Sequence, residues 1–223
     1  MKNRFDKGHL LGDWERCFLI IDSFPIRIPR PRSNKYQKAV YSGKYKYHCL
    51  KYEVAVRVRD GIICWIAGPA SGSIGDVRLT RKSGFLDFIL STEKVMGDKA
   101  YKGKGFENFL TPSKKPSKKI LKTLTIEIWQ EMRRSNRILC KLFPFPLFFH
   151  IKTTKIARVR VLVEHAIGRM KKFGALSGVW RGNYDFQAKA VLAVANITNL
   201  WIQEKPLRRT MKKNKNKKFI FPY

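Results

Sequence analysis

Residues 157–172 read Ala-Arg-Val-Arg-Val-Leu-Val-Glu-His-Ala-Ile-Gly-Arg-Met-Lys-Lys, and the rest of the chain can be placed around them. Apolar side chains recur in this stretch every three to four residues, which predicts an amphipathic helix. Its carboxylate, Glu164, lies among five basic residues and shares a helix face with Arg160, one turn away. A surface ion pair between these two side chains is the simplest interpretation, and a functional carboxylate is the alternative.

The composition indicates a folded protein with an anionic partner. The chain has 223 residues, of which 44% are hydrophobic, and this suits one domain with tails. Lys and Arg number 47 against 16 Asp and Glu, which gives a formal net charge of +31. Self-repulsion of this size disfavours the compact state unless an anionic partner neutralises it, and nucleic acid is the expected partner. An acidic membrane is the weaker alternative, because no basic helix with a clean apolar face is evident.

The cysteines and apolar runs bear on the compartment. Four cysteines are scattered without the spacing of a zinc site. The sequence has no apolar run of about 18 residues, and its first residues do not read as a signal peptide. We therefore expect no membrane partner and no secretion, with the protein in the nucleus of a eukaryotic host or the cytoplasm of a bacterial one.

Several stretches have the pattern of β-strands. The apolar run Cys17–Ile21 predicts a strand buried on both faces. Residues 45–59 alternate with period two, which predicts a strand with one buried face. Asp60-Gly61 then predicts a two-residue hairpin into a buried antiparallel strand at 62–67. Further short strands are expected at 94–97 and 106–110.

Two acidic residues follow predicted strands. Asp22 comes directly after the first apolar run, and Asp98 comes directly after residues 94–97. Neighbouring strand ends converge in space, so these two carboxylates can meet although they are far apart in the sequence. A third acid, Asp76, is expected instead to cap a short helix that begins at Val77.

This order of elements predicts an α/β fold, a mixed sheet flanked by helices. Asp22, Asp98 and Glu164 would form a carboxylate cluster at its edge. Three carboxylates cannot share a site in the ionised form unless cations neutralise them, and oxygen ligands favour Mg²⁺ or Mn²⁺ over zinc. A carboxylate cluster within a basic surface is typical of a two-metal phosphodiester site.

A basic, proline-spaced segment at residues 26–44 is expected to be extended rather than helical. Its basic residues alternate with tyrosines, which suits contact with phosphates and bases, and a solvated loop is an equal alternative. The residues expected to bind nucleic acid are Arg30, Arg32, Lys35, Lys44, Lys46, Arg160, Arg169, Lys171 and Lys172.

Five motifs, in order, resemble the DDE superfamily endonuclease domain of insertion-sequence and Harbinger-type transposases. They are Ile21-Asp-Ser-Phe-Pro-Ile26, the run from Tyr41 to Lys51, Gly72-Ser-Ile-Gly-Asp76, Gly97-Asp-Lys-Ala-Tyr-Lys-Gly103 and the run from Ala157 to Lys171. The resemblance extends from about Phe18 to Trp201 and implies a ribonuclease-H-like fold with Asp22, Asp98 and Glu164 as the catalytic triad. It also implies two divalent ions that activate a water and then a DNA 3′-hydroxyl, with Asp22 bridging both ions.

The resemblance further implies DNA as partner, in the form of transposon ends and target, with a separate DNA-binding protein and a homo-oligomer as further partners. Two departures are that position 75 is Gly where the family often has His, and that residues 118–155 do not match the family's usual approach to the Glu helix. The expected organisation is a short segment at 1–16, a catalytic domain at 17–204 with an insertion or irregular segment at 113–155, and a disordered basic tail at 205–223. A final helix is expected at Asp185–Glu204, with an apolar face of Ala190, Val191, Val194, Ile197 and Leu200 or Trp201.

The predicted function is that of a metal-dependent DNA endonuclease or strand-transferase of the transposase type, whole or truncated. One alternative is a transposase-derived DNA-binding protein whose acids are idle. Another is a basic RNA-binding or ribosome-associated protein, which the apolar content and the strand–acid pattern disfavour.

Overall fold

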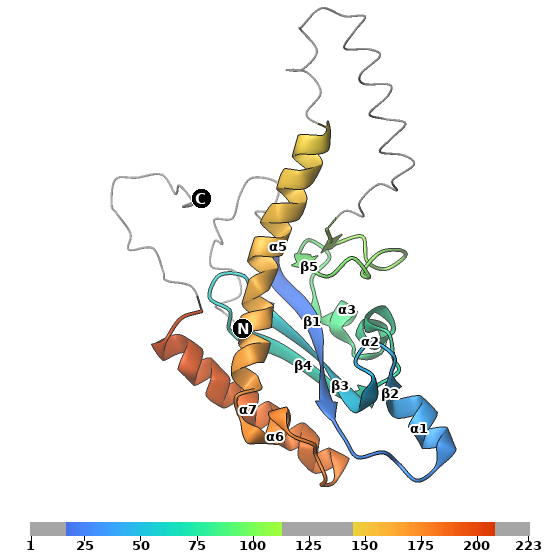
Figure 1. Ribbon diagram of the computed structural model, residues 1–223. Helices are drawn as coiled ribbons and strands as arrows, with labels where there is room; N and C mark the ends of the chain where they lie inside the picture. The colour runs from blue at the N-terminus through green and yellow to red at the C-terminus, as the bar shows by residue number, and fades with distance from the viewer. Residues whose placement is uncertain (1–16, 113–144, 208–223) are drawn as a thin grey trace, which may run out of the picture.

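A computed structural model of the chain describes residues 17–112 and 145–207 (Figure 1). At its centre is a mixed six-stranded sheet, in which β1 pairs with β3 on one side and β5 on the other. The strands are β1 (Cys17–Arg27), β2 (Tyr41–Ser42), β3 (Tyr47–Arg57), β4 (Ile63–Ser71), β5 (Lys94–Met96) and β6 (Phe109–Leu110). β1 and β4 run antiparallel to β3, whereas β1, β5 and β6 are parallel.

Helices cover both faces of this sheet (Figure 1). They are α1 (Asn34–Val40), α2 (Asp76–Lys82), α3 (Phe85–Phe88), α5 (Phe145–Met170), α6 (Gly174–Ser177) and α7 (Tyr184–Glu204). On one face Ile20 and Phe24 of β1 pack with Leu162 of α5 and Val194 of α7. On the other face Ile21 of β1 packs with the residues around α3. The predicted class, a mixed sheet flanked by helices, is therefore confirmed.

The central strand β3 corrects one prediction. Residues Cys49–Val56 are all buried, so the strand is covered on both faces and not on one. The alternation in the sequence arises because Tyr52 and Val54 face α5 and α7, whereas Lys51 and Glu53 face α2. These two polar side chains are buried together with hydrogen-bond partners, which a pattern of polar and apolar residues does not reveal.

The hairpin after β3 is present, but its loop is longer than the two residues predicted. β3 ends at Arg57 and β4 begins at Ile63. Asp60 accepts hydrogen bonds from the Arg57 guanidinium and the Ile62 backbone N–H, which stabilises the longer turn. The prediction of a buried strand here is wrong. Among the described strands β4 pairs with β3 alone, and within β4 only the first residue, Ile63, is buried.

Residues 34–40 form helix α1, so the prediction of an extended segment holds only around the prolines. Each proline restricts the residues beside it, and the helix begins three positions after Pro31. Helix α5 begins at Phe145, twelve residues before the stretch that predicted it, and includes the proline-interrupted run at 145–149. The predictions for residues 1–16, 113–144 and 208–223 lie outside the described residues.

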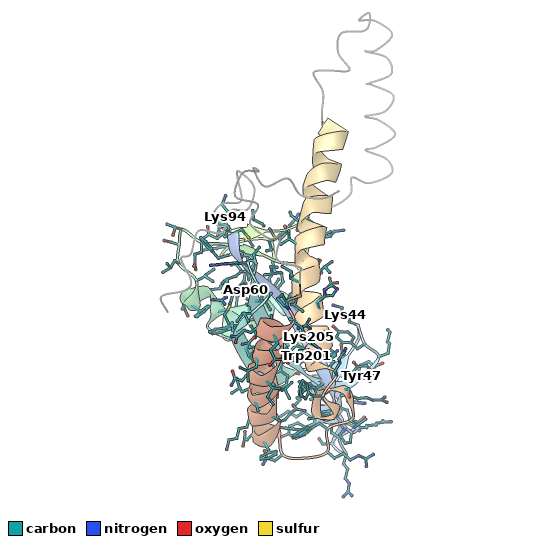
Figure 2. The ribbon with its side chains drawn as sticks, turned by 90° about the vertical axis from the view of Figure 1, so that its left-hand side faces the viewer. Lys44, Tyr47, Asp60, Lys94, Trp201 and Lys205 are labelled. Atoms are coloured by element: carbon teal, nitrogen blue, oxygen red, sulfur yellow. The ribbon has the colours of Figure 1, made fainter. Side chains whose placement is uncertain are left out.

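Helix α7 is confirmed, but its buried face differs from the prediction. Ile197 is 48% exposed and Leu200 62% exposed, whereas Gln187 and Thr198 are buried. Polar groups take part in this interface: Tyr52 donates to Gln187 at 2.9 Å, and the Asn199 amide bonds the backbone N–H and carbonyl of Ile63 at 2.8 and 2.9 Å. Beyond α7, Leu207 packs against the core beside the β3–β4 turn. The third residue of the tail predicted from residue 205 is therefore packed. Figure 2 shows this turn, marked by Asp60, near Lys205.

Candidate active site

Asp22 lies in the middle of β1. Prediction placed it at the strand's end, but antiparallel pairing with β3 continues through Phe24 and Pro25 to Arg27. Because side chains alternate along a strand, Asp22 points to the same face as Ile20 and Phe24, which is the face covered by α5. Burial raises the pKa of the Asp22 carboxyl, although the backbone N–H of Ser23, 2.8 Å from Oδ1, and the charge of Arg160 oppose that rise.

Asp98 lies just beyond β5, the parallel neighbour of β1. Gly97 lies between the end of β5 and Asp98. A Cβ at this position would lie 2.6 Å from the ring of Tyr101, so glycine is the residue that fits here without a shift of that ring. The backbone N–H of Lys99 donates to Asp98 Oδ1 at 2.7 Å. The carboxylate is therefore held by its own turn, with 45% of the side chain exposed.

Arg160 of α5 joins these two acids. Its Nη2 lies 3.8 Å from Asp22 Oδ2, and its Nη1 lies 3.5 Å from Asp98 Oδ1. The side chain is 15% exposed, and among the described residues its buried Nε has no hydrogen-bond partner. The structure thus brings together two of the three predicted acids around one positive charge.

Glu164 lies one turn after Arg160 on α5 and is exposed. The sequence predicted an ion pair between Glu164 and Arg160 as the simplest interpretation. The structure does not show that pair, because Arg160 pairs with Asp22 and Asp98 instead. Within residues 17–112 and 145–207 no three His, Cys, Asp or Glu side chains are grouped so that they could hold a metal ion. The chemistry of the donors still suits a hard cation, since the two convergent carboxylates supply oxygen atoms alone. The role of Glu164 stays a prediction.

Asp76 does not cap α2, contrary to the prediction. Gly75 occupies the N-cap position, and the Asp76 carboxylate accepts hydrogen bonds from Ser23 Oγ at 2.6 Å and Lys51 Nζ at 3.1 Å. Burial by itself would raise its pKa, but the Ser23 hydroxyl and the Lys51 charge together lower the pKa of Asp76. Sequence reasoning missed this contact. A lysine within a buried strand was the available signal, since such a charge needs an acidic partner.

The exposed basic residues expected to bind nucleic acid surround α1 and the turn between β2 and β3. They are Arg30, Arg32, Lys35, Lys44 and Lys46. In this turn the Lys44 ammonium lies 5.3 Å from the ring centre of Tyr45, and Tyr45 stacks on Tyr47 at 5.9 Å. Figure 2 shows Lys44 and Tyr47 at the other end of the sheet from Lys94. The charge of Lys44 also acts on Asp22 and Asp76, so this turn lies near the acids.

The basic residues at the end of α5 have partners within the protein. Arg169 and Lys172 lie over the ring of Trp201 at 5.0 and 5.1 Å, and Arg169 also donates to the Trp201 carbonyl at 3.3 Å. Lys171 is half-buried, and burial lowers the pKa of its ammonium. Their binding to nucleic acid stays a prediction.

The family model described as "DDE superfamily endonuclease" matches residues 21–142, more than half of the chain. The chain is 32% identical over 171 residues to the probable transposase for insertion sequence element IS702 of Microchaete diplosiphon. That alignment covers 74% of this chain and 50% of the relative, so the chain spans about half of the relative's length. No solved structure matches the chain. Among the described helices none is long and apolar enough to cross a membrane.

Proposed function

The chain belongs to the DDE superfamily endonuclease family, and on this premise we propose that it is a metal-dependent DNA endonuclease or strand-transferase of the transposase type. The observation that carries the proposal is the convergence of Asp22 and Asp98, from two parallel strands, on one positive charge. A pair of neighbouring carboxylates attracts cations, because the two groups cannot both stay ionised unless a positive charge lies close to them.

Asp22 and Asp98 would hold Mg²⁺ or Mn²⁺ together with Glu164, which follows Arg160 by one turn on the same helix. The chemistry that two divalent ions supply in such sites is activation of the attacking water or hydroxyl and neutralisation of the leaving oxygen. The chain itself positions the carboxylates: the Ser23 N–H bonds Asp22, and the Lys99 N–H bonds Asp98.

The proposed substrate is DNA, as transposon ends and target. The +31 net charge and the exposed basic residues around α1 and the β2–β3 turn support this choice. We expect Lys44, which is exposed in the β2–β3 turn and whose charge acts on Asp22, to bind the phosphate backbone beside the site. We also propose that the chain acts as a homo-oligomer and together with a separate DNA-binding protein.

The test is nicking of supercoiled plasmid by the full chain with Mg²⁺ or Mn²⁺. The variants are Asp98→Ala and Glu164→Gln. Their matched controls are Asp87→Ala and Glu204→Gln, which make the same changes at exposed acids away from the site. We expect metal-dependent nicking by the wild type and both controls, and its loss in both site variants with DNA binding retained.

A different result would favour the alternative function, that of a DNA-binding protein without nuclease activity. If the wild type binds DNA but nicks no faster than the Asp98→Ala and Glu164→Gln variants, the chain is a transposase-derived DNA-binding protein. Nicking that survives Glu164→Gln but not Asp98→Ala would instead remove Glu164 from the triad.

A further inference from the structure

Arg160 occupies the place between the two proposed metal ligands. Its guanidinium presents one nitrogen to each carboxylate, Nη2 to Asp22 at 3.8 Å and Nη1 to Asp98 at 3.5 Å. We propose that Arg160 is a built-in counter-ion that holds Asp22 and Asp98 together without metal and competes with divalent cations for them. This inference rests on the proposed function.

The geometry fits a counter-ion that can be displaced. A tight guanidinium–carboxylate pair has nitrogen–oxygen distances of about 2.7–2.9 Å and uses two parallel hydrogen bonds. Both distances at Arg160 are longer, each acid receives one nitrogen, and no side chain or backbone group in the described part of the chain accepts a hydrogen bond from the buried Nε. The guanidinium therefore neutralises the two carboxylates but does not satisfy all of its own hydrogen-bond donors. Moving it away from the two acids should cost less free energy than breaking a tight guanidinium–carboxylate pair.

The surroundings provide a second position for the side chain. Arg160 lies on α5 between the buried Val159 and the exposed Val161, at the border between core and solvent. A guanidinium released from the acids can bind a phosphate with two hydrogen bonds. Metal binding would thus free a cation for DNA, which couples the two binding events.

The test is Mn²⁺ titration of the full chain by calorimetry without DNA, comparing Arg160→Gln with the wild type. Arg181→Gln is the matched control, because it removes the same charge from an exposed position in the loop before α7. We expect Arg160→Gln to bind Mn²⁺ tighter by about 5- to 150-fold, the usual range for coupled sites. Arg181→Gln should bind as the wild type does.

A second readout is melting temperature. Without metal, Arg160→Gln should melt below the wild type because the two carboxylates then repel, and Mn²⁺ should raise its melting temperature more than that of the wild type. If Arg160→Gln does not fold, Arg160→Lys replaces it: a point charge on a shorter stem cannot face both acids, so its Mn²⁺ affinity should also exceed that of the wild type. Equal or weaker Mn²⁺ binding by the folded Arg160 variant overturns the inference.

Asp22→Asn separates this inference from the proposed function. If the wild type and the Arg160 variant bind Mn²⁺ equally and Asp22→Asn binds it more weakly, the counter-ion role is refuted and the proposed function stands. If none of the three binds Mn²⁺ at millimolar concentration, the metal-dependent function is refuted, and the inference with it. A DNA affinity that rises with Ca²⁺ in the wild type but not in the Arg160 variant supports the coupling. If Ca²⁺ raises the DNA affinity of the wild type and of the Arg160 variant equally, the coupling between metal binding and DNA binding is refuted.

Discussion

Lys51→Met tests whether one buried ion pair holds α2 against the sheet. The Lys51 side chain is 6% exposed and its partner Asp76 is 16% exposed, with Nζ and Oδ1 3.1 Å apart. Lys51 also donates to the Ile74 carbonyl at 2.8 Å. Removing one partner of a buried pair costs about 3–5 kcal/mol, because the other charge is left buried. We expect about 3 kcal/mol, the lower end of that range, because Ser23 still donates to Asp76.

The pH dependence of this loss follows from the Asp76 carboxyl. Its pKa in the folded protein is lowered, so stability that depends on its charge is fully present above the unfolded value of about 3.9 and is lost as pH falls through the lower folded value. The difference in unfolding free energy between wild type and Lys51→Met should therefore be largest near neutral pH and shrink below about pH 4. Urea denaturation followed by circular dichroism at pH 7 and pH 3 measures both values.

Two further variants make the test specific. Asp76→Asn combined with Lys51→Met should recover much of the loss, since no charge is then left buried, and a purely additive double variant would refute the pairing. Arg57→Met is the control: its pair with Asp60 has side chains 28% and 35% exposed, so its removal should cost at most about 1 kcal/mol. A loss in Lys51→Met below that of this control, or one of equal size at both pH values, would contradict the reasoning.

Gly97→Ala should destabilise the protein by about 1–3 kcal/mol in the same assay, because the added Cβ would lie 2.6 Å from the Tyr101 ring; wild-type stability would mean that the ring can move away freely. Tyr52→Phe should cost about 1–3 kcal/mol, because it leaves the buried Gln187 oxygen without its donor; an unchanged unfolding free energy would show that water or another group replaces the hydroxyl. DNA affinity measured by fluorescence anisotropy should fall steeply with salt, with a log–log slope of about 0.9 per phosphate contacted. A flat salt curve would refute the electrostatic account of binding.

The positions of Asp22, Asp98 and Glu164 in their elements were largely predictable. An apolar run before Asp22, a short strand before Asp98 and a 3.6-residue periodicity around Glu164 are local signals, and strand, strand and helix are observed there. The meeting of Asp22 and Asp98 was predicted from the convergence of strand ends, but the observed reason is different. Asp22 lies within β1, and Asp98 comes beside it because the parallel strand β5 ends at Met96, opposite Ile20. The extent of the elements was not: β1 continues five residues past Asp22 because β3 supplies hydrogen-bond partners along that length.

The sequence by itself determined the apolar strands, the acids that accompany them, the amphipathic helix and the basic charge, because each is a property of residues near one another in the chain. Tertiary structure alone decided that Arg160 lies between Asp22 and Asp98. It alone also decided that Lys51 pairs with Asp76, which accepts a hydrogen bond from Ser23 as well. The physical reason is that a buried charge finds its partner across packed elements, and the choice of partner depends on which faces meet. Residue spacing does not specify which faces meet: Arg160 has an acid four positions away on its own helix, yet it pairs with two acids that the sheet brings to it.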